Sequence, residues 1–157
     1  MKTKILGTGS FAPEKILTNF DLEKIVDTTD EWIRTRSGII ERRIVDDGTP
    51  TSDIAVEAAK RALDAAHISP KDLDAILVAT VTPDYVFPAT ACLLQQKLGA
   101  SRCMAFDFEA GCTGFVYGSI LANSLIMSGT ARHVLVIGAD LLTRITNWSD
   151  RGTCVLF

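Results

Sequence analysis

A chain of 157 residues is long enough for a sizeable hydrophobic core, and we expect one domain over residues 1–157. Its 47% hydrophobic and 22% charged residues are typical of a globular protein, while a net charge of −3 argues against non-specific nucleic-acid binding. No apolar stretch is long enough for a membrane span, and no signal peptide is evident. The four cysteines lack the spacing of a disulfide framework, which favours a reducing compartment. We therefore expect a cytoplasmic protein.

Short elements are predicted for the first third of the chain. In chain order they are a strand at 4–8, helices at 19–26 and 30–36, an extended segment at 39–46 and a turn at 47–50. Asn19 is the expected N-cap of the first helix, because its side chain can accept a hydrogen bond from the first turn. Ser37-Gly38 is expected to end the second helix.

Strands and helices are predicted to alternate along the rest of the chain. The expected elements are a helix at 51–66, a strand at 73–80, a loop at 82–88, a helix at 89–98, a strand at 103–108, a helix at 115–127 and a strand at 133–140. The apolar runs of 73–80 and 103–108 favour strands buried on both faces. The order βαβαβαβ predicts an α/β fold with a parallel sheet covered by helices. Residues 141–152 look irregular, and the strand-like run at 153–157 is typical of a domain truncated before its last strand.

Gly7-Thr8-Gly9-Ser10-Phe11-Ala12 fits the G-x-G-x-x-A pattern of dinucleotide-binding loops and follows an expected strand. Pro13 comes next, where a helix N-terminus would be needed to face a pyrophosphate. We therefore reject a nucleotide site at this position. Gly7 and Gly9 are instead expected to allow a tight backbone turn.

Cys112 lies in the segment Ala110-Gly111-Cys112-Thr113-Gly114-Phe115, between an expected strand and an expected helix that stops at Ser128-Gly129. In the first turn of that helix, free backbone N–H groups and the positive end of the helix dipole would favour a thiolate. Small neighbours would leave the sulfur open to a bulky substrate, so this segment is a candidate nucleophile. The alternative is a packing role, because free cysteine is usually buried and behaves as a small hydrophobe.

The remaining cysteines are expected to be packing residues: Cys92 in a helix, Cys103 at the start of a strand and Cys154 in the strand-like run. No pair of cysteines has C-x-x-C spacing, and His67 and His133 lie far apart in the sequence. The sequence therefore favours neither a metal site nor a redox dithiol. Both histidines are expected to be structural.

A tryptophan surrounded by basic residues is a second candidate site. Arg34, Arg36, Arg42 and Arg43 gather around Trp32 in the sequence. A solvated basic face would need no ligand. Alternatively, the indole could stack on a base while arginine binds phosphate or stacks on the other side, and Arg151 could complete such a sandwich.

Several segments together carry a family resemblance. They are Thr29-Asp30-Glu31-Trp32-Ile33, Arg36-Ser37-Gly38-Ile39, Val78-Ala79-Thr80, Phe87-Pro88, Phe106-Asp107, Cys112-x-Gly114-Phe115, Gly138-Ala139-Asp140 and Asp150-Arg151-Gly152-Thr153. In this order and spacing, the whole chain resembles the N-terminal half of β-ketoacyl-acyl-carrier-protein synthase III, the initiating condensing enzyme of bacterial fatty-acid synthesis. The family has a thiolase-like fold of two similar halves around one active site. The resemblance implies that residues 1–157 are the nucleophile-bearing half and that the C-terminal half is absent.

The resemblance also assigns roles to individual residues. Cys112 resembles the nucleophile that accepts an acyl group from acyl-CoA. Trp32 and Arg151 resemble the pair that sandwiches the adenine, with Thr28 beside it and Arg36 near the phosphates. The residues implied to line the acyl pocket are Val81, Phe87, Leu142, Leu156 and Phe157.

The implied reaction has two steps. Cys112 takes an acyl group from a CoA thioester such as acetyl-CoA and releases CoA; malonyl-acyl carrier protein then loses CO₂, and its enolate attacks the acyl-cysteine. The family's enolate-stabilising histidine and asparagine lie in the C-terminal half, so we expect this chain alone to be inactive in condensation. The implied partners are acyl-CoA, malonyl-acyl carrier protein and a second identical subunit, whose pocket Phe87 would enter. CoA is expected only as part of a substrate, with no cofactor, metal, nucleic-acid or membrane partner.

Two alternatives remain open. A sister condensing enzyme could use the same Cys112 chemistry to prime a polyketide or a quinolone, with a primer preference governed by residues such as Phe87 and Leu142. A non-catalytic fragment could instead self-associate through an exposed sheet edge. Rapid alkylation of Cys112 at neutral pH would distinguish an activated cysteine from a structural one.

Overall fold

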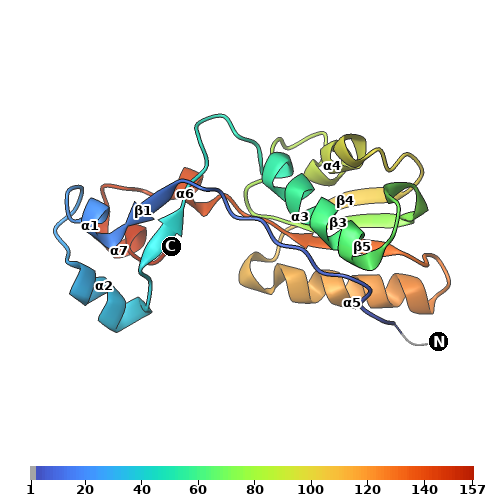
Figure 1. Ribbon diagram of the computed structural model, residues 1–157, viewed down its shortest axis with the longest axis horizontal. Coiled ribbons are helices and arrows are strands. Elements are labelled where there is room, and N and C mark those ends of the chain that lie inside the picture. Colours follow the sequence, from blue (N-terminus) through green and yellow to red (C-terminus); the bar gives the residue numbers. More distant parts are fainter. Residues whose placement is uncertain (1–2) are drawn as a thin grey trace. The chain divides into compact units, whose positions relative to one another are not determined.

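The computed structural model describes residues 3–157 (Figure 1). The chain divides into two compact units. The larger one, here called the sheet unit, comprises the described residues 3–11 and residues 50–140. The other, here called the small unit, comprises residues 12–49 and 141–157. Segments far apart in the sequence therefore meet within each unit.

A three-stranded parallel sheet forms the centre of the sheet unit. Its strands, in the order β4-β3-β5, are β3 (Ala75–Ala79), β4 (Met104–Phe108) and β5 (Val134–Gly138). Leu77 of β3 lies opposite Phe106 on one side and Val136 on the other. Every residue of β3 is buried, as its continuous apolar run predicts. The predicted α/β fold with a parallel sheet is confirmed.

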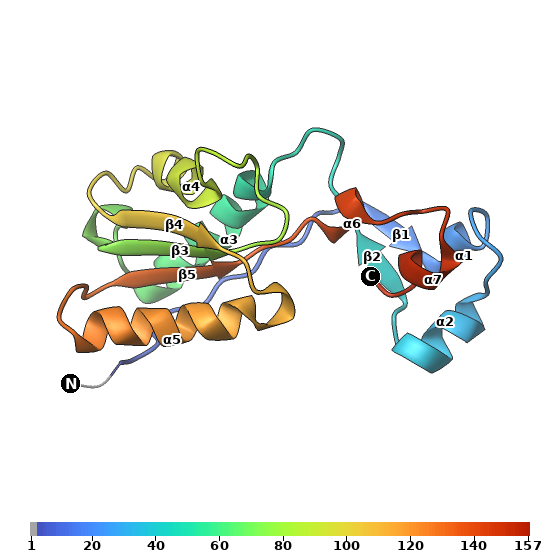
Figure 2. The same ribbon diagram turned by 180° about the vertical axis from the view of Figure 1, so that it is seen from behind.

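Helices cover both faces of this sheet, as Figures 1 and 2 show. α3 (Thr51–Ala66) and α4 (Thr90–Leu98) lie on one face, and α5 (Gly114–Met127) lies on the other. One-turn 3₁₀ helices precede β3 and α5, at η1 (Pro70–Asp72) and η2 (Gly111–Thr113). The bounds of α3, α4 and α5 agree with the sequence prediction to within one residue.

The core of the sheet unit lies between the sheet and α3 and α4. Its buried apolar residues are Ala55, Val56, Ala59, Leu63, Leu73, Ile76, Val78, Ala91, Leu94, Ala100, Leu135 and Ile137. On the other face, the buried residues of α5 are all small, namely Gly114, Gly118 and Ala122. The sheet and α5 therefore approach closely.

The N-terminal segment differs from the prediction, because residues 4–8 form no strand. Gly7 and Gly9 do not make a turn either; they lie against the backbone of α3. A Cβ atom added at Gly7 would lie 2.5 Å from the carbonyl oxygen of Ala62, and one at Gly9 would collide with the carbonyl oxygen of Ala58. Glycine is needed at these two positions because the α3 backbone leaves no room for a side chain, and not because the chain makes a tight turn here.

Two further strand predictions need correction. β4 is an edge strand, so Met104 and Phe106 are partly exposed, not buried on both faces. The run at 153–157 is not a strand, because the chain forms a helical turn, α7 (Arg151–Cys154). The Asp150 carboxylate accepts a hydrogen bond from the backbone N–H of Gly152 at 2.8 Å, and this N-cap starts the turn.

The small unit is built around a two-stranded antiparallel sheet. Its elements are β1 (Ile16–Thr18), α1 (Asn19–Leu22), α2 (Asp30–Ser37), β2 (Glu41–Arg43), α6 (Leu142–Ile145) and α7. α2 ends at Gly38, as predicted. The N-cap of α1 is Thr18, not Asn19, and Thr18 forms a reciprocal capping box with Asp21. Asn19 is instead fully buried.

Asp74 joins the starts of two parallel strands. Its Oδ2 accepts hydrogen bonds from the backbone N–H groups of Arg132 (2.7 Å) and His133 (3.0 Å), and these bonds hold the pKa of Asp74 below its usual value of 3.8. Because the folded state favours the ionised carboxylate, its contribution to stability is fully present above pH 3.8 and is lost as the pH falls from 3.8 through the lower pKa of the folded state.

Replacing Asp74 with asparagine is therefore expected to lower the free energy of unfolding by about 1 kcal/mol at pH 7, since hydrogen bonds to a charged acceptor are the stronger ones. Urea denaturation of both proteins at pH 7 and pH 3 measures this difference. It should shrink at pH 3, which lies below the usual pKa of 3.8, because the unfolded chain then binds a proton at this carboxyl and part of the contribution is lost. A difference that stays the same at both pH values would contradict the role of the charge.

Candidate active site

Cys112 lies where the chain passes from β4 to α5. It occupies η2, a single 3₁₀ turn that continues directly into the 14-residue helix α5. The prediction of a strand-to-helix junction is confirmed, with the difference that Cys112 precedes α5 and does not lie within its first turn. Its side chain is exposed. A substrate can therefore reach the sulfur from solvent.

Gly114 fixes the start of α5 against the sheet. A Cβ atom added at Gly114 would lie 2.8 Å from the Cβ atom of Ala79, at the end of β3. This is closer than two carbon atoms can pack, so α5 can begin here only with glycine. The third residue of the Cys112-x-Gly114 motif therefore positions α5 directly after the turn that holds Cys112.

Val81, Cys112 and Asp140 follow the carboxyl ends of three neighbouring parallel strands. Such ends meet at one edge of a parallel sheet, which is the usual place for a ligand site in α/β proteins. Asp140 ties this edge together, because its Oδ1 accepts hydrogen bonds from the Val81 backbone N–H at 2.8 Å and from Thr80 Oγ1 at 3.3 Å. Glu109, close to Cys112 in sequence, is exposed.

The other cysteines differ from Cys112 in their surroundings. Cys92 and Cys103 are partly buried, and Cys154 is fully buried. Burial raises the pKa of Cys103 and of Cys154 above the usual thiol value, which makes both thiols poor nucleophiles. Of the four cysteines, Cys112 alone combines exposure with a position at the start of a long helix.

Trp32, Arg36 and Arg151, here called the stacking cluster, come together in the small unit. Trp32 and Arg36 lie one turn apart on α2, and the guanidinium carbon of Arg36 is 4.4 Å from the centroid of the indole ring. Arg151, from the first position of α7, lies 4.3 Å from the same centroid. These are cation–π distances. The predicted association of Trp32 with arginines from two segments is confirmed.

Not all the arginines around Trp32 in the sequence belong to this cluster. Arg34 pairs with Asp30, and Arg43 pairs with Glu41 at 2.9 Å, both at the surface. Arg42 is buried and points into the small unit. The prediction of one basic cluster is therefore wrong for Arg42, because residues 41 and 43 occupy one face of β2 and residue 42 the other.

The remaining predicted ligand residues occupy separate places. Thr28 lies just before α2, and its Oγ1 is buried without a hydrogen-bond partner among the described residues. The Phe87 side chain is 88% exposed, in the loop between β3 and α4. Of the predicted acyl-pocket residues, Val81 and Phe87 belong to the sheet unit, and Leu142, Leu156 and Phe157 belong to the small unit.

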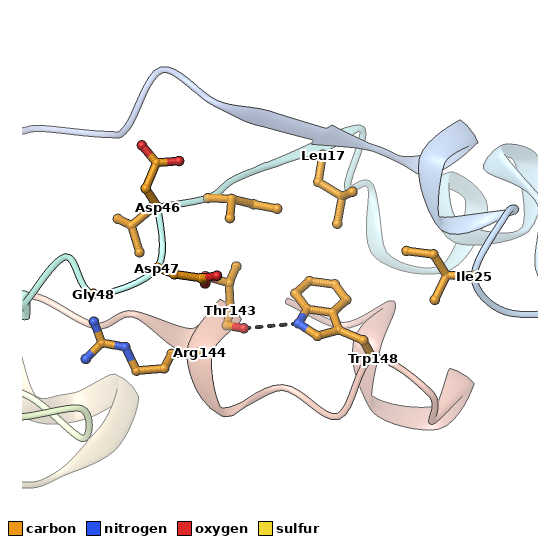
Figure 3. Close-up of a pocket in the computed structure, with 10 residues that line it drawn as sticks. Leu17, Ile25, Asp46, Asp47, Gly48, Thr143, Arg144 and Trp148 are labelled. Carbon is orange, nitrogen blue, oxygen red and sulfur yellow. Dashed lines mark hydrogen bonds between the residues drawn. The ribbon is translucent and has the colours of Figure 1, made fainter.

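A separate hollow of about 550 Å³ lies within the small unit (Figure 3). It is lined by Leu17, Ile25, Ile44, Val45, Asp46, Asp47, Gly48, Thr143, Arg144 and Trp148. The indole N–H of Trp148 donates a hydrogen bond to the backbone carbonyl of Thr143 at 3.1 Å, which fixes the ring at the wall. None of the predicted ligand residues lines this hollow.

No helix among residues 3–157 has the length and hydropathy to cross a membrane. Among the same residues, no three or more His, Cys, Asp or Glu side chains gather as ligands of a metal ion would.

Known proteins match this chain over nearly its whole length. A family model described as 3-oxoacyl-[acyl-carrier-protein] synthase III matches residues 106–157. β-Ketoacyl-[acyl-carrier-protein] synthase III of Caldanaerobacter subterraneus subsp. tengcongensis is 62% identical over 153 residues, which are 98% of this chain and 46% of that protein. The enzyme numbered III 1 from Bacillus anthracis is 57% identical over 157 residues, which are 100% of this chain and 51% of that protein.

Solved structures give the same result for the fold. The crystal structure of 3-oxoacyl-[acyl-carrier-protein] synthase III from Aquifex aeolicus superposes with a TM-score of 0.96 and 55% identity, over 99% of this chain and 50% of that one. The chain spans about half the length of the curated relatives that it matches.

Proposed function

We propose that this chain, which belongs to the β-ketoacyl-acyl-carrier-protein synthase III family, is the N-terminal half of such an enzyme and carries its nucleophile and its CoA-binding residues. The whole protein would transfer a short acyl group, such as acetyl, from CoA to Cys112. It would then condense that group with malonyl-acyl carrier protein to begin fatty-acid synthesis. The observation that carries the proposal is the exposed Cys112 at the start of α5, beside the carboxyl edge of a parallel sheet.

In the first step, the thiolate sulfur of Cys112 attacks the carbonyl carbon of the thioester. A new carbon–sulfur bond forms, the bond from that carbon to the CoA sulfur breaks, and CoA leaves as a thiolate that takes up a proton. The positive end of α5 stabilises negative charge at this point of the chain. The backbone N–H of Cys112 is the expected donor to the oxygen that becomes negative during the attack.

The stacking cluster is proposed to bind the adenine end of CoA. Trp32 offers a flat apolar surface to the base, Arg151 a planar cation for the other side, and Arg36 a charge for the phosphates. The buried, unpartnered hydroxyl of Thr28 supports a polar contact close to the same helix. No metal or additional cofactor is required by this chemistry.

Condensation would involve the whole protein, since the family's histidine and asparagine belong to the C-terminal half. We further propose a homodimer in the cytoplasm, with Phe87 reaching the partner's acyl pocket. The nearly complete exposure of Phe87 and of its neighbour Val86 supports this, because large apolar side chains on a loop favour an interface.

Intact-mass spectrometry after incubation with acetyl-CoA tests the proposal. We expect the parent chain to gain the mass of one acetyl group and the Cys112→Ala variant to gain none. A Cys92→Ser variant is the matched control, because it removes a partly buried thiol in the same unit and should leave the label unchanged.

Each other outcome has a definite meaning. A label that persists in Cys112→Ala would assign the nucleophile to another residue. A parent chain that remains unlabelled while its circular dichroism shows a folded protein would contradict acyl transfer by this half alone.

A further inference from the structure

A line of polar side chains, buried at Asn19 and Arg42, runs through the small unit from α2 to β2. The carboxylate Oδ1 of Asp30, in the first turn of α2, accepts a hydrogen bond from Asn19 Nδ2 at 2.8 Å. Asn19 Oδ1 in turn accepts one from Arg42 Nη1 at 2.6 Å. The second hydrogen on Asn19 Nδ2 goes to the backbone carbonyl of Ile39 at 2.8 Å, so the amide of Asn19 is well satisfied.

The far end of this line holds the residues that follow α7. Arg42 Nη2 donates to the backbone carbonyl of Val155 at 3.0 Å, and Arg42 Nε donates to that of Phe157 at 2.6 Å. The line therefore connects α2, which carries Trp32 and Arg36, with α7, which carries Arg151.

The apolar packing runs between the same two helices. Leu22, Ile33, Cys154 and Val155 are buried together, and Trp32 packs against this group. The indole that would receive the base thus touches the cluster that includes the last residue of α7 and the residue after it.

Stabilisation of the fold does not by itself explain why Asn19 and Arg42 form this buried line of hydrogen bonds. Arg42 is a buried cation that bonds an amide and two carbonyls, and burial lowers the pKa of Arg42 from its usual value. Apolar residues of similar volume often stabilise a core as well as buried charged groups do, whereas directional hydrogen bonds select one geometry. The geometry selected here is the backbone position of α7 relative to α2.

We propose that Asn19 and Arg42 are positioning residues for the adenine-binding site, holding α7 so that Arg151 stays over Trp32. This inference rests on the proposed CoA-binding function. The network fixes the backbone beneath Arg151, so that only the arginine side chain has to adjust when the base enters. Neither Asn19 nor Arg42 needs to touch CoA.

Calorimetric titration of the 157-residue chain with CoA tests this with Arg42→Lys, which keeps the charge but cannot reproduce the three-way hydrogen bonding. We expect the dissociation constant to rise about tenfold. Arg61→Lys is the matched control: Arg61 also donates to a backbone carbonyl, that of Ser10, and lies over a ring, that of Phe11, but in the sheet unit. This variant should bind CoA as the parent does.

A double-mutant cycle separates positioning from a general structural effect. If Arg42 acts through Arg151, then Arg42→Lys should change the dissociation constant by less than about twofold when Arg151 is already alanine. An equal effect in both backgrounds, or no effect in the parent, would overturn the proposal. If Arg151→Ala and Trp32→Ala themselves leave CoA binding unchanged, the proposed CoA site fails instead, and the two failures are distinguishable.

A milder variant covers the case in which Arg42→Lys does not fold. Asp30→Ala leaves the bonds of Arg42 intact, releases Asn19 Nδ2 at the α2 end of the line and also removes the surface ion pair with Arg34, which Arg34→Ala removes alone. We expect about threefold weaker CoA binding, again lost in the Arg151→Ala background. Glu31→Ala, next to it in the first turn of α2, is the control for removing an acidic residue there. Equal effects of Asp30→Ala and Glu31→Ala would contradict the proposal.

Discussion

Replacement of Trp32 by alanine is expected to weaken the binding of CoA to this chain by about thirtyfold. Stacking of one base on an aromatic side chain contributes about 1–3 kcal/mol, and about 2 kcal/mol corresponds to that factor in the dissociation constant. The variant removes the ring that Arg36 and Arg151 both approach, so the arginines also lose their common support. Calorimetric titration with CoA measures the change.

Trp32→Phe is the graded control, because phenylalanine keeps a flat ring with a weaker attraction for cations. Its dissociation constant should lie between those of the parent and of Trp32→Ala. Unfolding midpoints of all three proteins check that the small unit remains folded, since Trp32 also packs against the buried group around Ile33. Undiminished CoA binding by a folded Trp32→Ala protein would exclude the stacking cluster as the adenine site.

Replacement of Asp107 by alanine is expected to lower the free energy of unfolding by about 3 kcal/mol, since hydrogen bonds to a charged group contribute about 1.5–3 kcal/mol. Asp107 lies on β4, and its two carboxylate oxygens accept the backbone N–H groups of Thr90 at 2.6 Å and of Ala91 at 2.7 Å. The local N-cap of α4, Ala89, has no side chain that could do this. Asp107 therefore caps α4 from a neighbouring strand.

Urea denaturation at neutral pH measures this loss. Asp107→Asn should lose less than Asp107→Ala, because an amide oxygen can still accept one of the two hydrogen bonds. A loss of less than about 1 kcal/mol in Asp107→Ala would mean that water replaces the cap and that α4 does not depend on β4 for its start.

Local sequence signals predict the sheet unit well because its elements are determined by residues close in sequence. The uninterrupted apolar run around Ile76 and Val78 can only be a buried strand, and the alternation of such runs with amphipathic segments requires a parallel sheet. Gly99 ends α4 in the left-handed conformation, as the pattern indicates. The junction at Cys112 is predicted for the same reason, since a strand and a helix must meet within a few residues.

The parts that the sequence does not predict depend on partners distant in the chain. The sequence predicts Gly7 and Gly9 to be turn residues, because it does not show that the backbone of α3 packs against them. Asn19 looks like an N-cap, yet its amide bonds Asp30, Ile39 and Arg42. One signal was available for Arg42: Ile40 and Ile44 flank it at strand spacing, and an arginine on an apolar face is expected to be buried and paired.

If the stacking cluster binds adenine as proposed, the Arg151 guanidinium competes with that ligand for the Trp32 ring in the free protein. The guanidinium lies 4.3 Å from the ring centroid, whereas a base between two planar groups needs about 7–8 Å, twice an ordinary carbon–carbon separation. Adenine would therefore enter by displacing a cation that the indole already attracts, and this displacement offsets part of the stacking free energy. The phosphates of a nucleotide would draw Arg36 away from the ring, while the base would separate Arg151 from it. A preference for a phosphorylated adenine over the bare nucleoside would then follow from the two cations that already lie on the ring in the free protein.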